Sequence, residues 1–487
     1  MNTKPTSKRL KNEKTSAAQS DSSFLVRIDS GLVRGHLHKG TEPTPEFMGI
    51  PYAATTGGEN RYRAPQPRKP WGDEVWVADT PGPDCINNEQ GDGIFGGVIA
   101  EPRKTGEMVG DTYHQAEDSL FMNIWTPALD KEKRPVMVWI HGGGLRTDSS
   151  NRPCYVGNHL AHRGNVVVVA INYRLGGVGM MTHPALRDPE SGYMGNWNLL
   201  DMLFALQWIQ RNIHAFGGNK NNVTIFGESG GSVGVNDLAI IDKKIRGNLF
   251  HRVIGQSGDP ILSPLEQHIQ VAEKSFEFFG CKPENALVHI RQLSLEKFKK
   301  VADGWSSQRL FPTSDGKLIP SKSVYEAIRA GETEGLDWII GANGPGWDVG
   351  TEASWRSLLE HSKKGGRAYR YYLPDSPGVR GNHGTDIPLV FGTYEDNLGT
   401  LTERQGDRGG LVSRDNPNVP KLSARMIKSW TNFAWTGDPS FEDEELGKVR
   451  WETYKEDSLQ TIVWDDKPHL ERREPVTDAN VRARPQR

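Results

Sequence analysis

Two uninterrupted apolar runs mark the centre of the predicted fold. They read VMVWI at 136–140 and VVVVAI at 166–171, and residues typical of turns bound each of them. A strand that is buried on both faces has such a continuous run rather than an alternation of apolar and polar positions. We therefore predict two internal strands here. Shorter runs of the same character predict further strands over 223–226, 253–256, 338–340, 368–373 and 461–464.

Helical periodicity lies between the predicted strands. From Leu199 to Ile213 the apolar residues fall on one face of a helix, and the pattern stops at Gly217. A second helix is predicted over 422–435, where Gly437 provides a stop signal. Strands that alternate with helices predict an α/β fold, with a mostly parallel central sheet and helices on both faces.

The chain shows no internal repeat and no low-complexity linker. We expect one domain over residues 24–466. Residues 1–23 are rich in polar and basic positions and predict a disordered N-terminal tail, and the charged, proline-containing residues 467–487 predict a flexible C-terminal tail.

A serine between glycines is the strongest candidate for chemistry. The pentapeptide GESGG at 227–231 follows the predicted strand at 223–226 and precedes small residues that can begin a helix. A strand, a G-x-S-x-G turn and a helix in this order form a nucleophile elbow, which exposes the serine hydroxyl above the sheet. Ser229 is therefore the candidate nucleophile. The alternative is a plain glycine-rich turn.

A second glycine-rich loop, HGGG at 141–144, directly follows the predicted strand at 136–140. Backbone N–H groups on such a loop can bind the negative charge that develops on a carbonyl oxygen during acyl transfer. We assign Gly143, Gly144 and Gly230 as the candidate donors of this oxyanion hole.

These motifs and their order resemble the type-B carboxylesterases, the cholinesterase-like branch of the α/β-hydrolase family. The resemblance covers roughly residues 24–465 and includes FMGIPYA at 47–53, EDSLFMNIWTP at 117–127, GNWNLLD at 195–201, the serine turn and NHGTDIPLVF at 382–391. It implies an α/β-hydrolase fold with Ser229 as nucleophile and His383 as general base, because a serine hydroxyl needs a base to take its proton. Glu228 and Ser257 are expected beside this pair, where they support it by hydrogen bonds.

The third member of the triad is where the chain departs from the family. The family places an acid, usually Glu, after a strand in the pattern G-x-N-x-x-E, but the corresponding segment reads GANGPGW and has Gly346 at the acid position. Asp348 is our first candidate and Glu352 the alternative. Asp386, another carboxylate or the absence of any acid also stay open.

The stretch between Asp348 and His383 is short compared with the family. The family has a long helical section there that walls the active site. That section is absent from this sequence, so we expect a wide site that accepts short-chain aryl esters. The segment between Cys85 and Ser119 also contains no Trp, the residue with which cholinesterases hold a quaternary ammonium. Choline esters are therefore not the expected substrates.

Composition narrows the function classes further. With 59 basic and 61 acidic residues the formal net charge is −2, which gives no reason to expect a nucleic-acid partner. No apolar run approaches the ~18 residues of a membrane span, and residues 1–23 lack the apolar stretch of a secretory signal. The sequence contains no phosphate-binding loop and no Cys/His ligand cluster, so no cofactor or metal is expected.

The chain has three cysteines, and Cys85 stands where the resemblance places a disulfide. The position of its expected partner holds Ser119, so we predict free thiols and a cytoplasmic protein.

The predicted function is hydrolysis of a small-molecule carboxylic ester through an acyl-enzyme on Ser229, with His383 as general base and then general acid. The alternative, motivated by the missing acid, is a catalytically weakened or inactive cholinesterase-like binding protein. The oligomeric state stays open.

Overall fold

A large twisted sheet organises the chain. The computed structural model describes residues 24–87, 115–306, 310–344, 351–396, 411–413 and 415–474. The sheet has 11 strands in the order β18-β17-β14-β13-β12-β11-β9-β10-β8-β4-β3. In chain order these are β3 (His36–Leu37), β4 (Pro45–Pro51), β8 (Phe121–Trp125), β9 (Arg134–Ile140), β10 (Val167–Ile171), β11 (Gly218–Glu228), β12 (Arg252–Gln256), β13 (Asp337–Asn343), β14 (Arg367–Leu373), β17 (Gln460–Val463) and β18 (His469–Arg472).

The middle of this sheet is parallel and its two ends are antiparallel. From β10 through β9, β11, β12, β13 and β14 to β17 every neighbouring pair runs in the same direction. Strands β8, β4 and β3 continue one end, and β18 the other, in antiparallel pairs. The carboxyl ends of the parallel strands therefore share one edge, which is where α/β folds of this kind bind ligands.

Strand β9 shows why this sheet has helices on both faces. Its residues are all buried, and they alternate between two apolar cores. Val136, Val138 and Ile140 belong to one core, while Met137 and Trp139 belong to the other. A continuous apolar run is thus what a strand needs when both of its faces are covered.

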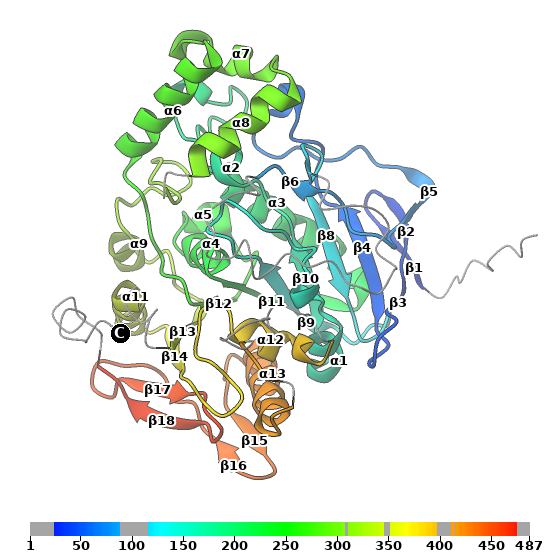
Figure 1. Ribbon diagram of the computed structural model, residues 1–487, viewed down its shortest axis with the longest axis vertical. Helices are drawn as coiled ribbons and strands as arrows, with labels where there is room; N and C mark the ends of the chain where they lie inside the picture. Colours follow the sequence, from blue (N-terminus) through cyan, green and yellow to red (C-terminus); the bar gives the residue numbers. More distant parts are fainter. Residues whose placement is uncertain are drawn as a thin grey trace, which may run out of the picture.

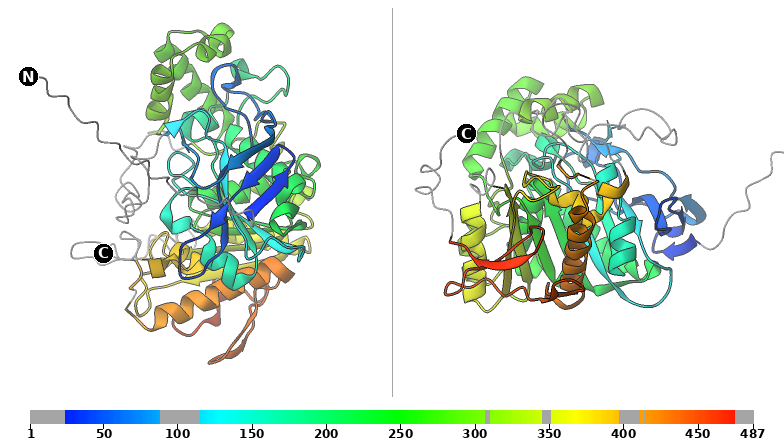
Figure 2. Two further views of the ribbon diagram at one scale, coloured as in Figure 1. Left: turned by 90° about the vertical axis from the view of Figure 1, so that its right-hand side faces the viewer. Right: turned by 60° about the horizontal axis from the view of Figure 1, so that its bottom comes forward.

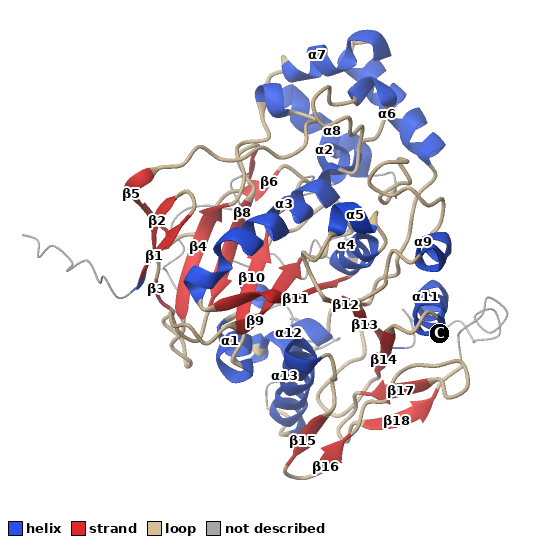
Figure 3. Cartoon of the chain, turned by 180° about the vertical axis from the view of Figure 1, so that it is seen from behind, coloured by secondary structure: helices blue, strands red, loops and turns tan. Residues whose placement is uncertain are grey.

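Twelve α-helices cover the sheet or extend from it in the described part of the chain. They are α1 (Asn158–Gly164), α2 (Gly176–Met180), α3 (Trp197–Asn212), α4 (Gly230–Ala239), α5 (Lys243–Arg246), α6 (Leu265–Phe279), α7 (Ala286–Arg291), α8 (Leu295–Ser306), α9 (Val324–Ala330), α11 (Thr351–Lys363), α12 (Asp386–Phe391) and α13 (Asn418–Thr436). Figure 1 shows α1, α12 and α13 on the near face, and Figure 3 shows α3, α4, α9 and α11 on the other. Helices α6, α7 and α8 gather beyond one end of the sheet, at the top of Figure 1.

Smaller sheets flank this core. The N-terminal strands form a separate sheet, β1 (Leu25–Ile28), β2 (Gly31–Arg34) and β5 (Gly72–Val77), and the left view of Figure 2 shows it facing the viewer. Two short pairs complete the β-structure: β6 (Asp84–Cys85) with β7 (Gln115–Ala116), and β15 (Phe441–Asp443) with β16 (Gly447–Val449). None of the described helices combines the length and apolar character needed to cross a lipid bilayer.

The predicted central elements are confirmed, with differences at their boundaries. Helix α3 matches its prediction closely, whereas α13 begins at Asn418, four residues before the predicted start at 422. The predicted tail over 467–487 is wrong in its first part, because β18 continues the main sheet there. The rest of that tail, from 475, and the N-terminal tail over 1–23 lie outside the described residues.

Candidate active site

Ser229 stands on a strained turn between β11 and α4. Its φ of 56° and ψ of −120° are unusual for a residue with a side chain. The turn is locked from both sides, because the Ser229 N–H donates to the carbonyl of Gln256 at 2.8 Å and its own carbonyl accepts from Val233 N at 3.0 Å. Strained backbone of this kind persists only where the surroundings hold it, and it is frequent at functional sites.

Close backbone packing explains the glycines around Ser229. A Cβ on Gly231 would lie 1.9 Å from the carbonyl oxygen of Ile140, and one on Gly227 would lie 2.6 Å from the same oxygen. No side chain fits at such distances. The glycines of the predicted nucleophile elbow are therefore required by the closeness of the Ile140 carbonyl at the end of β9.

The second glycine loop touches this turn. Gly143, Gly144 and Leu145 follow one another with φ values of 79°, 64° and 60°, and the carbonyl of Gly143 accepts from Arg146 N at 3.0 Å. A Cβ on Gly230 would lie 2.6 Å from the backbone nitrogen of Gly144. The structure thus brings together the backbone of the predicted oxyanion donors Gly143, Gly144 and Gly230.

Buried polar residues in and around this loop hold one another by hydrogen bonds. Asp148 accepts hydrogen bonds from Arg152 Nε at 2.6 Å and from the hydroxyl of Tyr155 at 2.7 Å. His141 stacks on the ring of Tyr173, whose hydroxyl donates to the carbonyl of His141 at 2.7 Å. Burial lowers the pKa of His141 to about 4, so this imidazole is neutral at pH 7. Sequence reasoning did not identify Asp148, Arg152 or Tyr155.

His383 lies in the connection between β14 and α12, and it reaches the last residue of β11. Its Nε2 is 3.3 Å from Glu228 Oε1, so the predicted neighbour Glu228 is in contact with the predicted base. Burial lowers the pKa of His383 to about 4 and raises that of Glu228 well above its usual value. Both groups therefore favour their neutral forms. Ser229 Oγ makes no hydrogen bond to a described residue, and such catalytic contacts often tighten only when substrate is bound.

A carboxylate three positions after His383 anchors this connection. Asp386 accepts hydrogen bonds from Gln256 Nε2 at 2.9 Å, Asn343 Nδ2 at 2.9 Å and the hydroxyl of Tyr371 at 2.6 Å. These partners come from β12, β13 and β14, so one buried side chain ties the start of α12 to adjacent strands. Asp386 fixes the His383 connection to the sheet edge.

The residues predicted as the acid are only partly within the described structure. Asp348 lies outside the described residues, and Glu352 lies in α11. The chain enters the segment before Asp348 beside the His383 connection, since a Cβ on Gly344 would lie 1.4 Å from the carbonyl oxygen of Gly381. The role of Asp348 and that of Glu352 stay predictions.

The segment after β12 also borders Ser229. Ser257 has a φ of 54°, and its Oγ makes no hydrogen bond to a described residue, so its supporting role stays a prediction. A Cβ on Gly258 would lie 2.3 Å from the carbonyl oxygen of Ser229. Asp259 accepts a hydrogen bond from Ser354 of α11, and burial raises the pKa of Asp259 to about 6. This contact ties the start of α11 to the active-site edge.

The cysteines are free thiols, as predicted. Cys85, Cys154 and Cys281 are buried, and Cys85 Sγ lies 3.9 Å from the carbonyl oxygen of Ser119. The two positions that the resemblance pairs are therefore neighbours in space. Within the described residues no group of His, Cys, Asp and Glu side chains is arranged to hold a metal ion.

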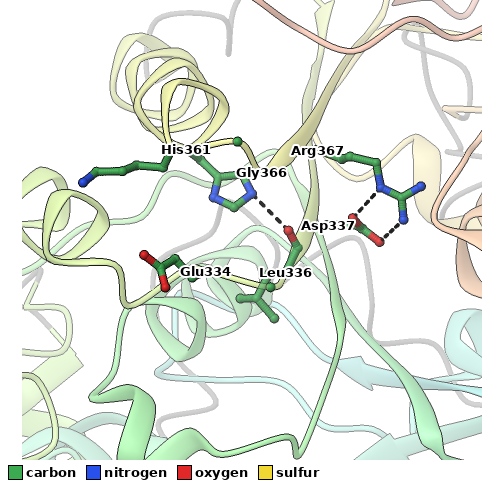
Figure 4. A pocket seen from close by; sticks show the side chains of 9 residues that line it. Glu334, Leu336, Asp337, His361, Gly366 and Arg367 are labelled. Carbon is green, nitrogen blue, oxygen red and sulfur yellow. Dashed lines mark hydrogen bonds and ion pairs between the residues drawn. The ribbon is translucent and has the colours of Figure 1, made fainter.

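A pocket of about 230 Å³ lies away from this site, at the amino ends of β13 and β14 (Figure 4). It is lined by Glu334, Gly335, Leu336, Asp337, His361, Lys364, Gly365, Gly366 and Arg367. His361 Nε2 donates to the carbonyl of Leu336 at 3.1 Å, and the Arg367 guanidinium donates twice to Asp337, at 2.7 and 2.6 Å. Because these groups bind one another at the opposite end of the strands from Ser229, we assign no reaction to this pocket.

Comparison with known proteins agrees with this geometry. A profile of the carboxylesterase family matches residues 22–347. The chain belongs to the carboxylesterase family. It is 39% identical to the fumonisin B1 esterase of Sphingopyxis macrogoltabida in an alignment of 506 positions. The alignment covers 87% of this chain and 84% of that protein. It is 35% identical to carboxylesterase 1C of Rattus norvegicus, over 86% of each protein.

Para-nitrobenzyl esterase of Bacillus subtilis is 27% identical over 92% of this chain and 96% of its own length. A solved structure of a PNB esterase superposes with a TM-score of 0.77 at 26% identity, and covers 92% of this chain and 97% of the other. The α/β-hydrolase fold and an esterase function are thereby confirmed. The chain is a serine carboxylesterase, and the family profile ends before His383.

The loop that carries the predicted oxyanion donors provides a first test. We expect Gly144→Val to lower kcat by about 10²- to 10³-fold, the usual cost of losing one oxyanion donor. Valine disfavours the φ of 64°, and its Cβ would lie 3.0 Å from Arg146 Nη2, so the loop must shift. Gly447→Val is the matched control, because Gly447 has a φ of 68° in open space within the β15–β16 hairpin. Turnover of 4-nitrophenyl acetate and the melting temperature are measured for both. Wild-type kcat in a fully folded Gly144→Val would contradict the assignment.

The acid limb of the pH profile provides a second test. A general base must be neutral, and burial lowers the pKa of His383 to about 4. We therefore expect kcat/KM for a neutral ester to stay on its plateau as the pH falls from 7 to 5, and to halve near pH 4. Enzyme returned to pH 7 after each assay controls for acid unfolding. A reversible half-point at the ordinary histidine pKa of about 6.5 would contradict the lowering of the His383 pKa by burial.

Proposed function

We propose that this esterase cleaves carboxylic esters through an acyl-enzyme on Ser229. The observation that carries the proposal is the contact between the Ser229 turn and the oxyanion loop, where a Cβ on Gly230 would lie 2.6 Å from Gly144 N. A carbonyl above Ser229 would have its oxygen among the N–H groups of Gly143, Gly144 and Gly230. That arrangement stabilises the charge of a tetrahedral intermediate.

His383 moves the protons in this reaction. It takes the proton of the Ser229 hydroxyl as the oxygen attacks the ester carbonyl, and gives it to the departing alcohol. Water then attacks the acyl-enzyme by the same route and releases the acid. For these steps His383 Nε2 turns from Glu228 towards Ser229 when substrate fills the site.

Asp348 is our proposed partner for the other imidazole nitrogen, with Glu352 as the alternative. A carboxylate there selects the tautomer and stabilises the imidazolium. Two observations support a position after β13. Asn343 Nδ2 donates to the carbonyl of Asn382 at 3.2 Å, and the backbone of Gly344 packs against Gly381. The chain thus leaves β13 directly beside the residue that precedes His383.

The proposed substrates are short-chain aryl esters. The sequence lacks the long helical section before His383 that walls the site in the family, which favours a wide site with weak discrimination between acyl groups. The relatives named above are esterases, which does not favour a purely binding role. We place the protein in a reducing compartment such as the cytoplasm because its cysteines are free.

Labelling with a fluorophosphonate tests the function and the nucleophile together. We expect stoichiometric modification of Ser229, located by mass spectrometry, with parallel loss of hydrolysis of 4-nitrophenyl acetate. Ser229→Ala should take no label and should lose essentially all turnover, because removal of a triad serine costs about 10⁶-fold in kcat. A folded wild-type protein that is neither labelled nor active would favour the binding alternative.

The acid is tested by comparing Asp348→Asn with Glu352→Gln, which remove one charge each from neighbouring positions. We expect Asp348→Asn to lower kcat on an unactivated ester by up to about 10⁴-fold, while activated esters are affected less. Glu352→Gln serves as the control and should retain turnover. Loss in Glu352→Gln alone would move the role to Glu352, and wild-type turnover in both variants would exclude both residues.

A further inference from the structure

The carbonyl of Gly143 is the point on which the loop after β9 closes. The N–H and the hydroxyl of Thr147 both donate to this carbonyl, at 3.1 and 3.2 Å. A Cβ on Gly143 would lie 2.3 Å from the carbonyl oxygen of Thr147. The Gly143 carbonyl and the Gly144 N–H belong to one trans peptide unit, so they lie in one plane and point in opposite directions. The hydrogen bonds from Thr147 therefore set the direction of the Gly144 N–H.

Asp148, the residue after Thr147, has an unusual backbone conformation and a fixed side chain. Its φ is 82°, in the left-handed region that Asp adopts more readily than most residues with a side chain. Both carboxylate oxygens accept hydrogen bonds, Oδ1 from Arg152 Nε at 2.6 Å and Oδ2 from the Tyr155 hydroxyl at 2.7 Å. The side chain is only 4% exposed, so its displacement would leave buried donors without an acceptor. Asp148 thus fixes the backbone next to Thr147.

Tyr155 connects Asp148 to the packed core. The Tyr155 ring contacts Trp139 of β9, with ring centroids 5.1 Å apart, and Phe391 of α12, with centroids 6.1 Å apart. Trp139 also packs edge-on against Phe226 of β11 at 4.9 Å. All four rings are buried, and closely packed rings of this kind have little room to shift. The loop that begins at the end of β9 is therefore tied, at its other end, to a side chain of the same strand.

We propose that Asp148 and Tyr155 are positioning residues that keep the Gly144 N–H aimed at the ester oxygen in the transition state. The inference rests on the proposed function and adds the groups that hold the oxyanion donors in place. Charge on a tetrahedral intermediate is stabilised by donors that are oriented before the reaction begins. Loss of the hydrogen bond between Asp148 and Tyr155 should therefore weaken binding of the transition state more than binding of the ground state.

Three variants separate this hydrogen bond from other roles of the two residues. Tyr155→Phe removes one hydroxyl and keeps the ring. Asp148→Asn and Asp148→Gly both suit a φ of 82°, so they keep the backbone preference and remove the carboxylate. We expect kcat/KM for 4-nitrophenyl acetate to fall by about 10-fold in Tyr155→Phe and by about 10- to 100-fold in the Asp148 variants, mainly through kcat. These losses are smaller than the ~10²- to 10³-fold loss from removing a donor, because the donor is loosened and not removed.

Tyr394→Phe is the matched control. Tyr394 is also buried, and its hydroxyl also donates to a carboxylate, that of Glu395 at 2.8 Å, in the short 3-10 helix η8 (Thr393–Asp396). This variant should keep wild-type kcat/KM. Active sites are titrated to completion with a fluorophosphonate, so that each rate refers to folded enzyme, and the melting temperature of every variant is recorded.

Two ketones provide a readout that a purely structural role would not move. In 1,1,1-trifluoro-4-phenylbutan-2-one the carbonyl is activated: Ser229 Oγ bonds to its carbon, His383 takes the hydroxyl proton, and the C=O electron pair becomes the charge of an oxyanion. The unactivated 4-phenylbutan-2-one has the same skeleton and binds as a ketone. We expect the Ki of the trifluoro compound to rise in Tyr155→Phe and in the Asp148 variants by the same factor by which kcat/KM falls. The Ki of the other ketone should stay close to that of wild type.

Wild-type turnover per active site in Asp148→Asn and Asp148→Gly would overturn the inference, whether or not the melting temperature falls. An equal rise in Ki for both ketones would also overturn it, because the change would then lie in ground-state binding. If the trifluoro compound does not inhibit wild-type enzyme and Gly144→Val keeps full turnover, the proposed function fails and the inference fails with it. If Gly144→Val weakens binding of the trifluoro compound and Tyr155→Phe does not, the proposed function stands and only the inference fails.

Discussion

The candidate active site depends on one constraint, the close packing of the Ser229 turn against the backbone at the end of β9. The turn that carries Ser229 can reach its strained conformation only because Gly227 and Gly231 leave no side chain against the carbonyl of Ile140. The same closeness brings Gly230 against Gly144. The proposed nucleophile and the proposed oxyanion donors are therefore positioned by parts of the chain that are in direct contact, and stabilisation of charge needs such preorganised donors.

The proposed base is held in a different way. His383 comes from a connection whose next carboxylate, Asp386, is hydrogen-bonded to Gln256, Asn343 and Tyr371. Each partner lies at or near the carboxyl end of its strand, so the connection follows the sheet edge. A buried carboxylate with three donors is costly to displace, because its removal leaves the donors unsatisfied. The position of the proposed base His383 thus depends on side-chain hydrogen bonds, whereas the position of Ser229 depends on close backbone packing that excludes side chains.

Much of the fold could be predicted because the parallel strands are continuous apolar runs. Strand β9 is the clearest example, since every residue in it is buried. The prediction failed at β18, which is a charged edge strand with mostly exposed residues and carries no apolar pattern. It also placed the start of α13 too late: Val419 in the first turn is buried like Leu422, but Pro420 and Lys421 interrupt the apolar pattern between them.

The sequence by itself determined the local chemistry: a serine turn and an oxyanion loop are short motifs whose glycines are needed within a few residues of one another. Only the tertiary structure decided which distant groups meet. Gln256 and Asp386 are 130 positions apart, and no local pattern joins them. The position of Arg146 over Gly144 likewise depends on the direction in which the loop turns after β9. Motifs can be recognised in a sequence because local backbone geometry requires particular residues at fixed spacings. Long-range contacts are set instead by the packing of strands, whose order in the sheet differs from their order in the chain.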